Sequence, residues 1–157
     1  MTHAPLVSDD VDPEISPDHA APSLLDVAGA FIGGTFGTLA RYAFDRAWPE
    51  GDGAVPHTTN VINTTGAFLI GVVATVLANR CPERRALRAL LVTGALGGWT
   101  TMSAVAVAAA RIGSVNGAFT ATASSALSFA IGIGATSVGI RLASSRRTET
   151  ETESEGP

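Results

Sequence analysis

The sequence predicts an all-α membrane protein with four transmembrane helices, and three observations carry that prediction. Hydrophobic residues make up 46% of the 157 residues and charged residues only 15%, well below the roughly 25% of an average soluble domain. Four apolar segments of 21 or more residues follow one another with short connections, and a helix of roughly 20 residues crosses a bilayer. Four buried helices of a soluble protein would need a polar exterior, which this composition does not supply.

The apolar segments form one domain between two polar tails. We expect a disordered acidic tail at residues 1–22, a four-helix transmembrane domain at 23–143 and a disordered polar tail at 144–157. Nine of the fourteen acidic residues lie in the two tails, so the net charge of −4 describes the tails rather than a ligand site. The predicted helices are Leu24–Phe44, Thr58–Asn79, Leu87–Ala110 and Asn116–Leu142.

The arginines predict how the chain is oriented in the plasma membrane. All ten basic residues are arginines, and cytoplasmic loops of membrane proteins carry an excess of basic residues. An even number of spans places both termini on one side, and the richer side predicts that both termini are cytoplasmic. Seven arginines lie on that side, and two on the other: Arg80, Arg84, Arg85, Arg88, Arg141, Arg146 and Arg147 against Arg46 and Arg111.

Several function classes are excluded by what the sequence contains. No basic cluster is interleaved with aromatic residues, which argues against a nucleic-acid partner. The single Cys81 rules out an internal disulfide and a multi-cysteine metal site. No Asp or Glu lies centrally in an apolar segment, whereas a proton-coupled exporter would need one there. The histidines form no acid–base group, so we expect no enzyme.

Polar residues inside the first two segments are candidates for function, because they are costly in lipid and tend to face a bundle interior. Arg41 either attracts an anion to a pore vestibule or snorkels to the interface. Thr59 and Asn63 lie one turn apart on one helix face, where hydroxyl and amide groups offer hydrogen-bond donors. The alternative for any single threonine is a bond back to its own helix.

The third and fourth segments hold the other candidates. Paired glycines followed by paired threonines, from Gly97 to Thr101, predict that the third helix is broken mid-membrane, with carbonyls available to a cation. A packing notch is the alternative. Ser124 and Ser128 lie one turn apart and form either a hydroxyl track or a contact between helices.

Glycines spaced four residues apart, at Gly29, Gly33 and Gly37, predict close helix packing. Four glycine-rich helices enclose little interior, so a pathway through the protein needs a second copy or a partner chain.

Three motifs follow one another on the expected helices: Gly33-Gly34-x-x-Gly37-x-x-x-Arg41-Tyr42, Asn63-x-x-Gly66-x-Phe68-Leu69-x-Gly71 and Gly94-x-x-Gly97-Gly98-x-Thr100-Thr101-x-Ser103. Together they resemble the motifs of the CrcB/Fluc family of fluoride channels, and the resemblance covers about residues 24–142. It implies an antiparallel two-subunit channel in the lipid bilayer, with two pores, a central structural sodium ion and passive export of fluoride from the cytoplasm.

The resemblance also implies roles for individual residues. Asn63 and Thr59 would line the anion path, with Ser128 on a polar track. Arg41 would lie near the pore entrance. The backbone carbonyls of Gly97 and Thr100 would help to hold the sodium ion.

The sequence departs from the family where two phenylalanines face the permeating ion, because Met102 and Val105 occupy those pore-lining positions. Ser124 stands where the family has a tyrosine. The strong arginine bias should fix one orientation, which suggests a heterodimer whose paralogous partner has the opposite orientation and supplies the missing rings. A homodimer is the alternative for assembly. A non-conducting structural subunit and a small multidrug exporter are the alternatives for function.

Overall fold

The computed structural model describes residues 21–50 and 55–154, and every regular element among them is a helix. The predicted disordered tail at 1–22 therefore lies outside the described residues, apart from its last two. The elements are α1 (Leu24–Ala47), α2 (His57–Arg80), α3 (Arg85–Arg88), the π-helix η2 (Ala89–Leu96), α4 (Gly97–Trp99), α5 (Met102–Asn116) and α6 (Ala118–Ser154).

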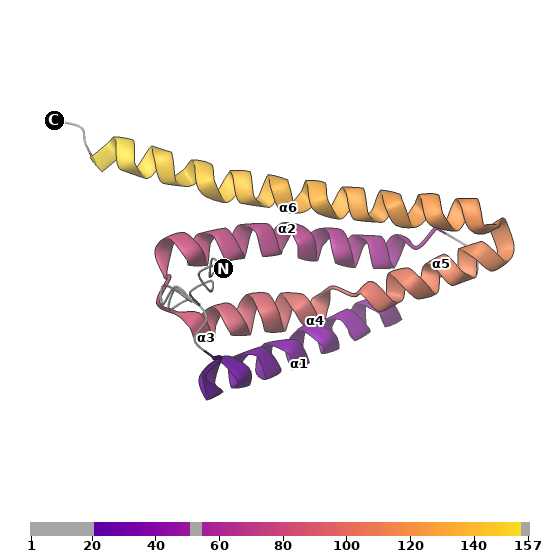
Figure 1. Ribbon diagram of the computed structural model, residues 1–157, viewed down its shortest axis with the longest axis horizontal. Helices are drawn as coiled ribbons and strands as arrows, with labels where there is room; N and C mark the ends of the chain where they lie inside the picture. The colour runs from indigo at the N-terminus through magenta and orange to yellow at the C-terminus, as the bar shows by residue number, and fades with distance from the viewer. Residues whose placement is uncertain (1–20, 51–54, 155–157) are drawn as a thin grey trace, which may run out of the picture.

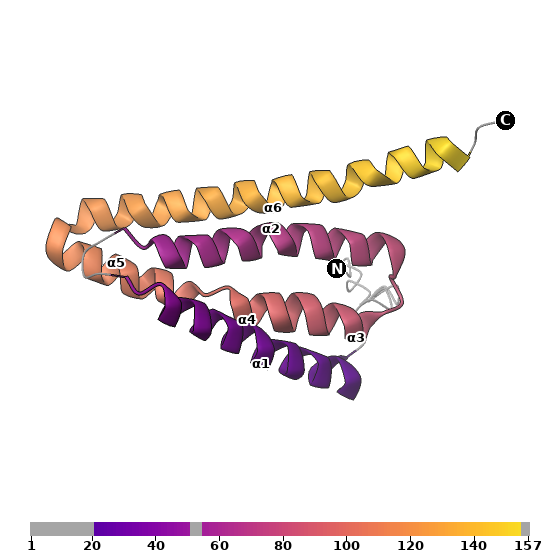
Figure 2. The same cartoon turned by 180° about the vertical axis from the view of Figure 1, so that it is seen from behind.

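The helices lie side by side: α1 runs parallel to the segment from α3 to α5, α6 runs parallel to α2, and the two pairs run in opposite directions (Figure 1). The segment from α3 to α5 lies between α1 and α2, and α6 covers the other side of α2, as the reverse view also shows (Figure 2). The main contacts join α2 to α6 and α1 to η2, and α5 reaches α6 near the α5–α6 turn. The start of α1, the end of α2 and the C-terminal end of α6 lie at one end of the bundle (Figure 1).

Local sequence explains where α1 begins and ends. The Ser23 hydroxyl accepts the Asp26 backbone N–H at 3.2 Å, and the Asp26 carboxylate accepts the Ser23 backbone N–H at 2.9 Å. This reciprocal capping satisfies two backbone donors that a helix start leaves unpaired. At the other end, Trp48 precedes Pro49, and a residue before proline disfavours the helical conformation.

Backbone-to-backbone contacts hold α1 against η2 and α4. Gly33 and Gly37 are buried, and a Cβ on them would overlap the carbonyl oxygens of Leu90 and Ala95. A Cβ on Gly94 would lie 2.6 Å from the Ala30 carbonyl oxygen. The predicted close packing of the glycines in the first helix is thereby confirmed.

The connection between α5 and α6 differs from the prediction. The sequence suggested a loop at Arg111–Val115, but α5 continues through Asn116 and the chain turns at Gly117. Gly117 has a φ of 86°, and it is the only residue with positive φ in the described part of the chain. A residue without a Cβ adopts that conformation at little cost, so the reversal falls there.

The last helix also extends beyond its predicted end. A disordered tail was expected from residue 144, whereas α6 continues to Ser154. No glycine or proline occurs between Gly139 and Gly156, so nothing in the sequence interrupts the helical backbone hydrogen bonds.

The outside of the bundle is apolar. Phe31, Phe119 and Ile133 are 76%, 87% and 69% exposed, as expected for side chains that face lipid. Among the described residues, three helical segments are long and apolar enough to cross a membrane: His57–Arg80, Arg85–Asn116 and Ala118–Ser145. α1 is not among them, because glycines and the charges at its two ends lower its hydropathy.

Candidate functional site

The segment between α4 and α5 leaves the helical conformation at two residues. Thr100 (φ −75°, ψ 156°) and Thr101 (φ −150°, ψ 124°) are extended. The Thr101 hydroxyl accepts the Ala104 backbone N–H at 3.2 Å and so caps α5. This interruption leaves backbone groups near the middle of the bundle that need partners from neighbouring helices.

Asn63 on α2 supplies both partners for Thr101. Its Nδ2 donates to the Thr101 carbonyl oxygen at 2.9 Å, and its Oδ1 accepts the Thr101 backbone N–H at 2.8 Å. The side-chain amide thus pairs with the backbone as a neighbouring strand would. One N–H of the amide remains beyond this pair, because an NH₂ group carries two donors.

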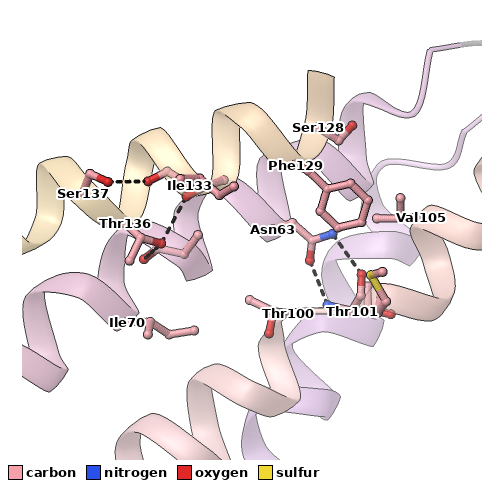
Figure 3. A pocket seen from close by; sticks show the side chains of 13 residues that line it. Asn63, Ile70, Thr100, Thr101, Val105, Ser128, Phe129, Ile133, Thr136 and Ser137 are labelled. Atoms are coloured by element: carbon pink, nitrogen blue, oxygen red, sulfur yellow. Dashed lines mark hydrogen bonds between the residues drawn. The ribbon is translucent and has the colours of Figure 1, made fainter. Parts of the chain in front are cut away.

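An open pocket of about 450 Å³ lies beside this pair, between α2, α5 and α6. Figure 3 shows the Asn63 amide, the paired threonines and the side chains of α6 around it. Most of the wall is apolar, and hydroxyl groups are spaced along it. The residues that line it are Asn63, Ala67, Ile70, Thr100, Thr101, Met102, Val105, Ser128, Phe129, Gly132, Ile133, Thr136 and Ser137.

Ser128 links α6 to α2 at one end of this pocket. Its hydroxyl donates to Asn60 Oδ1 at 2.7 Å and lies 3.0 Å from the Ser124 carbonyl oxygen. Ser124, Ser128 and Thr59 line a narrow second cavity together with Val105. Ser124 and Ser128 therefore lie on the same face of α6 and line the same cavity, as their spacing predicts.

Thr59 is buried near the start of α2, where it is hydrogen-bonded to the carboxylate of Glu50. The Thr59 backbone N–H donates to Glu50 Oε1 at 2.8 Å, and its hydroxyl lies 3.5 Å from Glu50 Oε2. Backbone N–H groups at a helix start attract negative charge. In this structure, a side chain of the protein itself already occupies that position.

Arg41 lies on the other side of the interrupted helix and does not line the pocket. Its Nε donates to the Gly98 carbonyl oxygen at 3.2 Å, and the Thr38 hydroxyl donates to the same oxygen at 3.5 Å. Its guanidinium also lies 4.0 Å from the Asp45 carboxylate. The cation of α1 therefore satisfies a carbonyl that the interruption leaves without a helical partner.

Gly97 lies in α4 just before this interruption, and Thr100 lies within it. The Thr100 hydroxyl donates to the Leu96 carbonyl oxygen at 3.0 Å and lies 3.5 Å from the Gly97 carbonyl oxygen. Carbonyl and hydroxyl oxygens are suitable ligands for a hard monovalent cation, and unwound helices supply them in other membrane proteins. Within the described residues no cluster of His, Cys, Asp or Glu could hold a metal ion.

The structure thus brings five of the predicted site residues to one pocket and leaves the others around it. The sequence singled out neither Phe129 nor Glu50, although both have a part in this region. Phe129 follows Ser128 directly, so its place on α6 was a usable signal. Glu50 lies in a connection without periodicity, and no pattern singled it out. The five residues in the pocket are Asn63, Thr100, Met102, Val105 and Ser128.

Comparison with known proteins gives a consistent match. Residues 28–140 match the family model described as CrcB-like protein, Camphor Resistance (CrcB). The chain is 43% identical over 82 residues to fluoride-specific ion channel FluC 1 of Cutibacterium acnes, which covers 50% of this chain and 57% of that protein. It is 42% identical over 81 residues to FluC 2 of Streptomyces avermitilis, covering 52% and 51%. The matched part therefore spans about half the length of these relatives.

Proposed function

This chain belongs to the CrcB-like protein family, and from that membership we propose that it is a subunit of a passive fluoride channel that exports fluoride from the cytoplasm. The observation that carries the proposal is the pocket at the helix interruption, whose mostly apolar wall holds the Asn63 amide and a series of hydroxyl groups that includes Ser128. Relatives over half of the chain are named as fluoride-specific ion channels, which supports fluoride as the ion.

Fluoride is small and strongly hydrated, so a pore must replace its water with close positive groups. Amide and hydroxyl hydrogens do this without a formal charge. An apolar wall lowers the local dielectric constant and strengthens each such contact. The pocket combines the Asn63 amide with a mostly apolar wall.

We further propose that four helices span the membrane, with α1 as the first and the interrupted helix as the third. α1 has 24 residues, enough for the hydrocarbon core, and runs antiparallel to α2 along the bundle (Figure 1). Arg80 and Arg84 lie at the end of the bundle where α1 begins, and Arg111 lies near the other end. This distribution supports cytoplasmic termini.

The channel would be an antiparallel dimer, because the pocket is open on one side and needs a second subunit to close it. The arginine bias favours a heterodimer with a paralogue of opposite orientation. Cys81 offers a direct test, because it is the single cysteine and lies at the end of α2. A membrane-impermeant maleimide should label it from the cytoplasmic side alone; equal labelling from both sides would favour a homodimer.

A structural sodium ion would lie at the interruption, held by oxygens of Gly97 and Thr100. Two residues from one subunit leave the coordination incomplete, so the symmetry-related residues of a second subunit would complete it. The ion would supply fixed positive charge between the two subunits. Its binding is tested by comparing thermal unfolding of the purified protein in sodium and in N-methylglucamine buffer.

A non-conducting subunit is the second candidate function. The observation in its favour is that the Asn63 amide already pairs with the Thr101 backbone, while Met102 and Val105 add only apolar surface. Such a chain would stabilise a partner that conducts alone.

Fluoride efflux from liposomes, read with a fluoride electrode, tests the proposal. We expect rapid voltage-driven efflux from the chain co-purified with a paralogue, unchanged when the proton gradient is collapsed. Efflux from the chain alone would show that a homodimer conducts. A proton-dependent flux would instead indicate an exporter, and a pair no faster than the paralogue alone would support the structural role.

Glu50→Gln is expected to raise the efflux rate, because it removes a negative charge beside Thr59 while an amide oxygen can still accept the Thr59 N–H. Two unit charges 4 Å apart in water interact by about 1 kcal/mol, which corresponds to roughly a fivefold change in rate. Glu83→Gln is the control, since Glu83 is exposed between α2 and α3 at the far end of the bundle. Equal rates for the two variants would place Glu50 off the path.

A further inference from the structure

Phe129 is the one aromatic side chain among the residues that line the pocket. It projects from α6 beside the Asn63 amide, with Val105 of α5 nearby (Figure 3). Met102 and Val105 give this part of the wall its apolar character. The Phe129 ring therefore lies beside polar groups of both α2 and α6, namely Asn63 and Ser128.

The hydroxyl groups of the pocket are already engaged within the protein. Ser128 donates to Asn60 at 2.7 Å, Thr136 to the Ala67 carbonyl at 3.1 Å, and Ser137 to the Ile133 carbonyl at 2.8 Å. Thr100 and Thr101 likewise bond to groups at the interruption. A hydroxyl has a single hydrogen, so an anion in the pocket would find few of these donors available.

Two positive groups remain for such an anion. One is the second N–H of Asn63, which the pair with Thr101 leaves over. The other is the edge of the Phe129 ring, because the hydrogens of an aromatic ring carry the positive part of its quadrupole. Apolar neighbours lower the local dielectric constant and so strengthen a contact between an anion and a ring edge.

The ring is accessible to the pocket. Phe129 is 44% exposed, so neighbouring side chains do not cover the whole ring. Gly132 lies on the same face of α6, and a Cβ added there would meet nothing within 4 Å. There is consequently space beside the ring for a small ion.

We propose that Phe129 contacts the permeating anion through its ring edge, together with Asn63, and so provides within this chain an aromatic contact that Met102 and Val105 cannot. This inference rests on the proposed function. It assigns the anion contact to α6 of this chain, whereas the arginine bias suggested that a partner supplies the rings.

Three variants test it by fluoride efflux from liposomes, in the smallest assembly that conducts. Phe129→Leu should slow efflux about tenfold, equivalent to about 1.4 kcal/mol in the barrier. Phe129→Tyr keeps the ring edges and should retain most of the rate. Phe119→Leu is the matched control, because Phe119 is on the same helix, 87% exposed and outside the pocket. Gel filtration confirms that each variant is folded.

The outcomes separate the two proposals. If the unmodified assembly conducts and Phe129→Leu matches Phe119→Leu, the role of Phe129 is refuted while the channel stands. If Phe129→Tyr is as slow as Phe129→Leu, packing rather than the ring edge is responsible, and the inference also fails. If no assembly containing the unmodified chain conducts, the proposed function is lost and the inference with it.

Discussion

Replacing Gly37 with alanine is expected to produce one of the largest losses of stability of any single substitution in this chain. The added Cβ would overlap the Ala95 carbonyl oxygen and lie 3.0 Å from the Trp99 backbone nitrogen. Both neighbours are backbone atoms of the interrupted helix, which no change of rotamer can move. Overpacking of this kind costs about 1–3 kcal/mol. Unfolding of the purified protein in detergent, followed by circular dichroism, measures the effect.

Gly34→Ala is the matched control for this prediction. It lies on the same helix, and the nearest atom to its added Cβ is the Gly94 carbonyl oxygen at 4.0 Å. Alanine also favours a helix more than glycine does, by about 1 kcal/mol. We therefore expect Gly34→Ala to be neutral or stabilising. Equal unfolding curves for the two variants would mean that α1 is not held by these close contacts.

Asn63→Ala is expected to weaken both folding and fluoride flux. It leaves the Thr101 N–H and carbonyl without the partners that hold them at 2.8 and 2.9 Å. Each buried polar group left unpaired costs about 1–3 kcal/mol, so a total of about 2–6 kcal/mol is expected for the two groups. Asn63→Asp should also fail, because a carboxylate cannot donate to the Thr101 carbonyl and places a negative charge in the pocket.

Asn79→Ala controls for the loss of an asparagine from α2, since Asn79 is exposed at the end of the same helix. Unfolding and efflux are measured on the same preparations. If Asn63→Ala unfolds like Asn79→Ala, the hydrogen bonds between the Asn63 amide and the Thr101 backbone do not stabilise the fold. A destabilised Asn63→Ala with unaltered flux would point to the non-conducting subunit.

The positions of the helices were largely predictable from the sequence, because they depend on the length of the apolar segments. Leu24 begins α1 as expected, and α2 differs by one residue at each end. The turn at Gly117 was missed because Gly113 lies within the expected connection and is an equally plausible breaking point by composition. Only the structure shows which glycine takes the positive φ.

The partners of the polar side chains were not predictable in the same way. Periodicity places Asn63 and Thr59 on one face of α2, but it does not give the rotation of α2 relative to its neighbours. That rotation decides whether Asn63 meets the Thr101 backbone, as it does, or remains free for a ligand. The same limit applies to Arg41, which turns to the Gly98 carbonyl rather than to the pocket.

Because Arg41 turns to the Gly98 carbonyl rather than to the pocket, it adds no charge to the pocket wall. Of the described residues that line the pocket, none is ionisable. Its field therefore comes from dipoles, which decay with distance faster than the field of a charge. Long-range electrostatic steering of anions would need exposed charge, which dissolved salt screens within about 10 Å at 0.1 M. Under the proposed function the pocket would act on ions that have already arrived, so ionic strength should affect the efflux rate only through the charge of Glu50 beside Thr59.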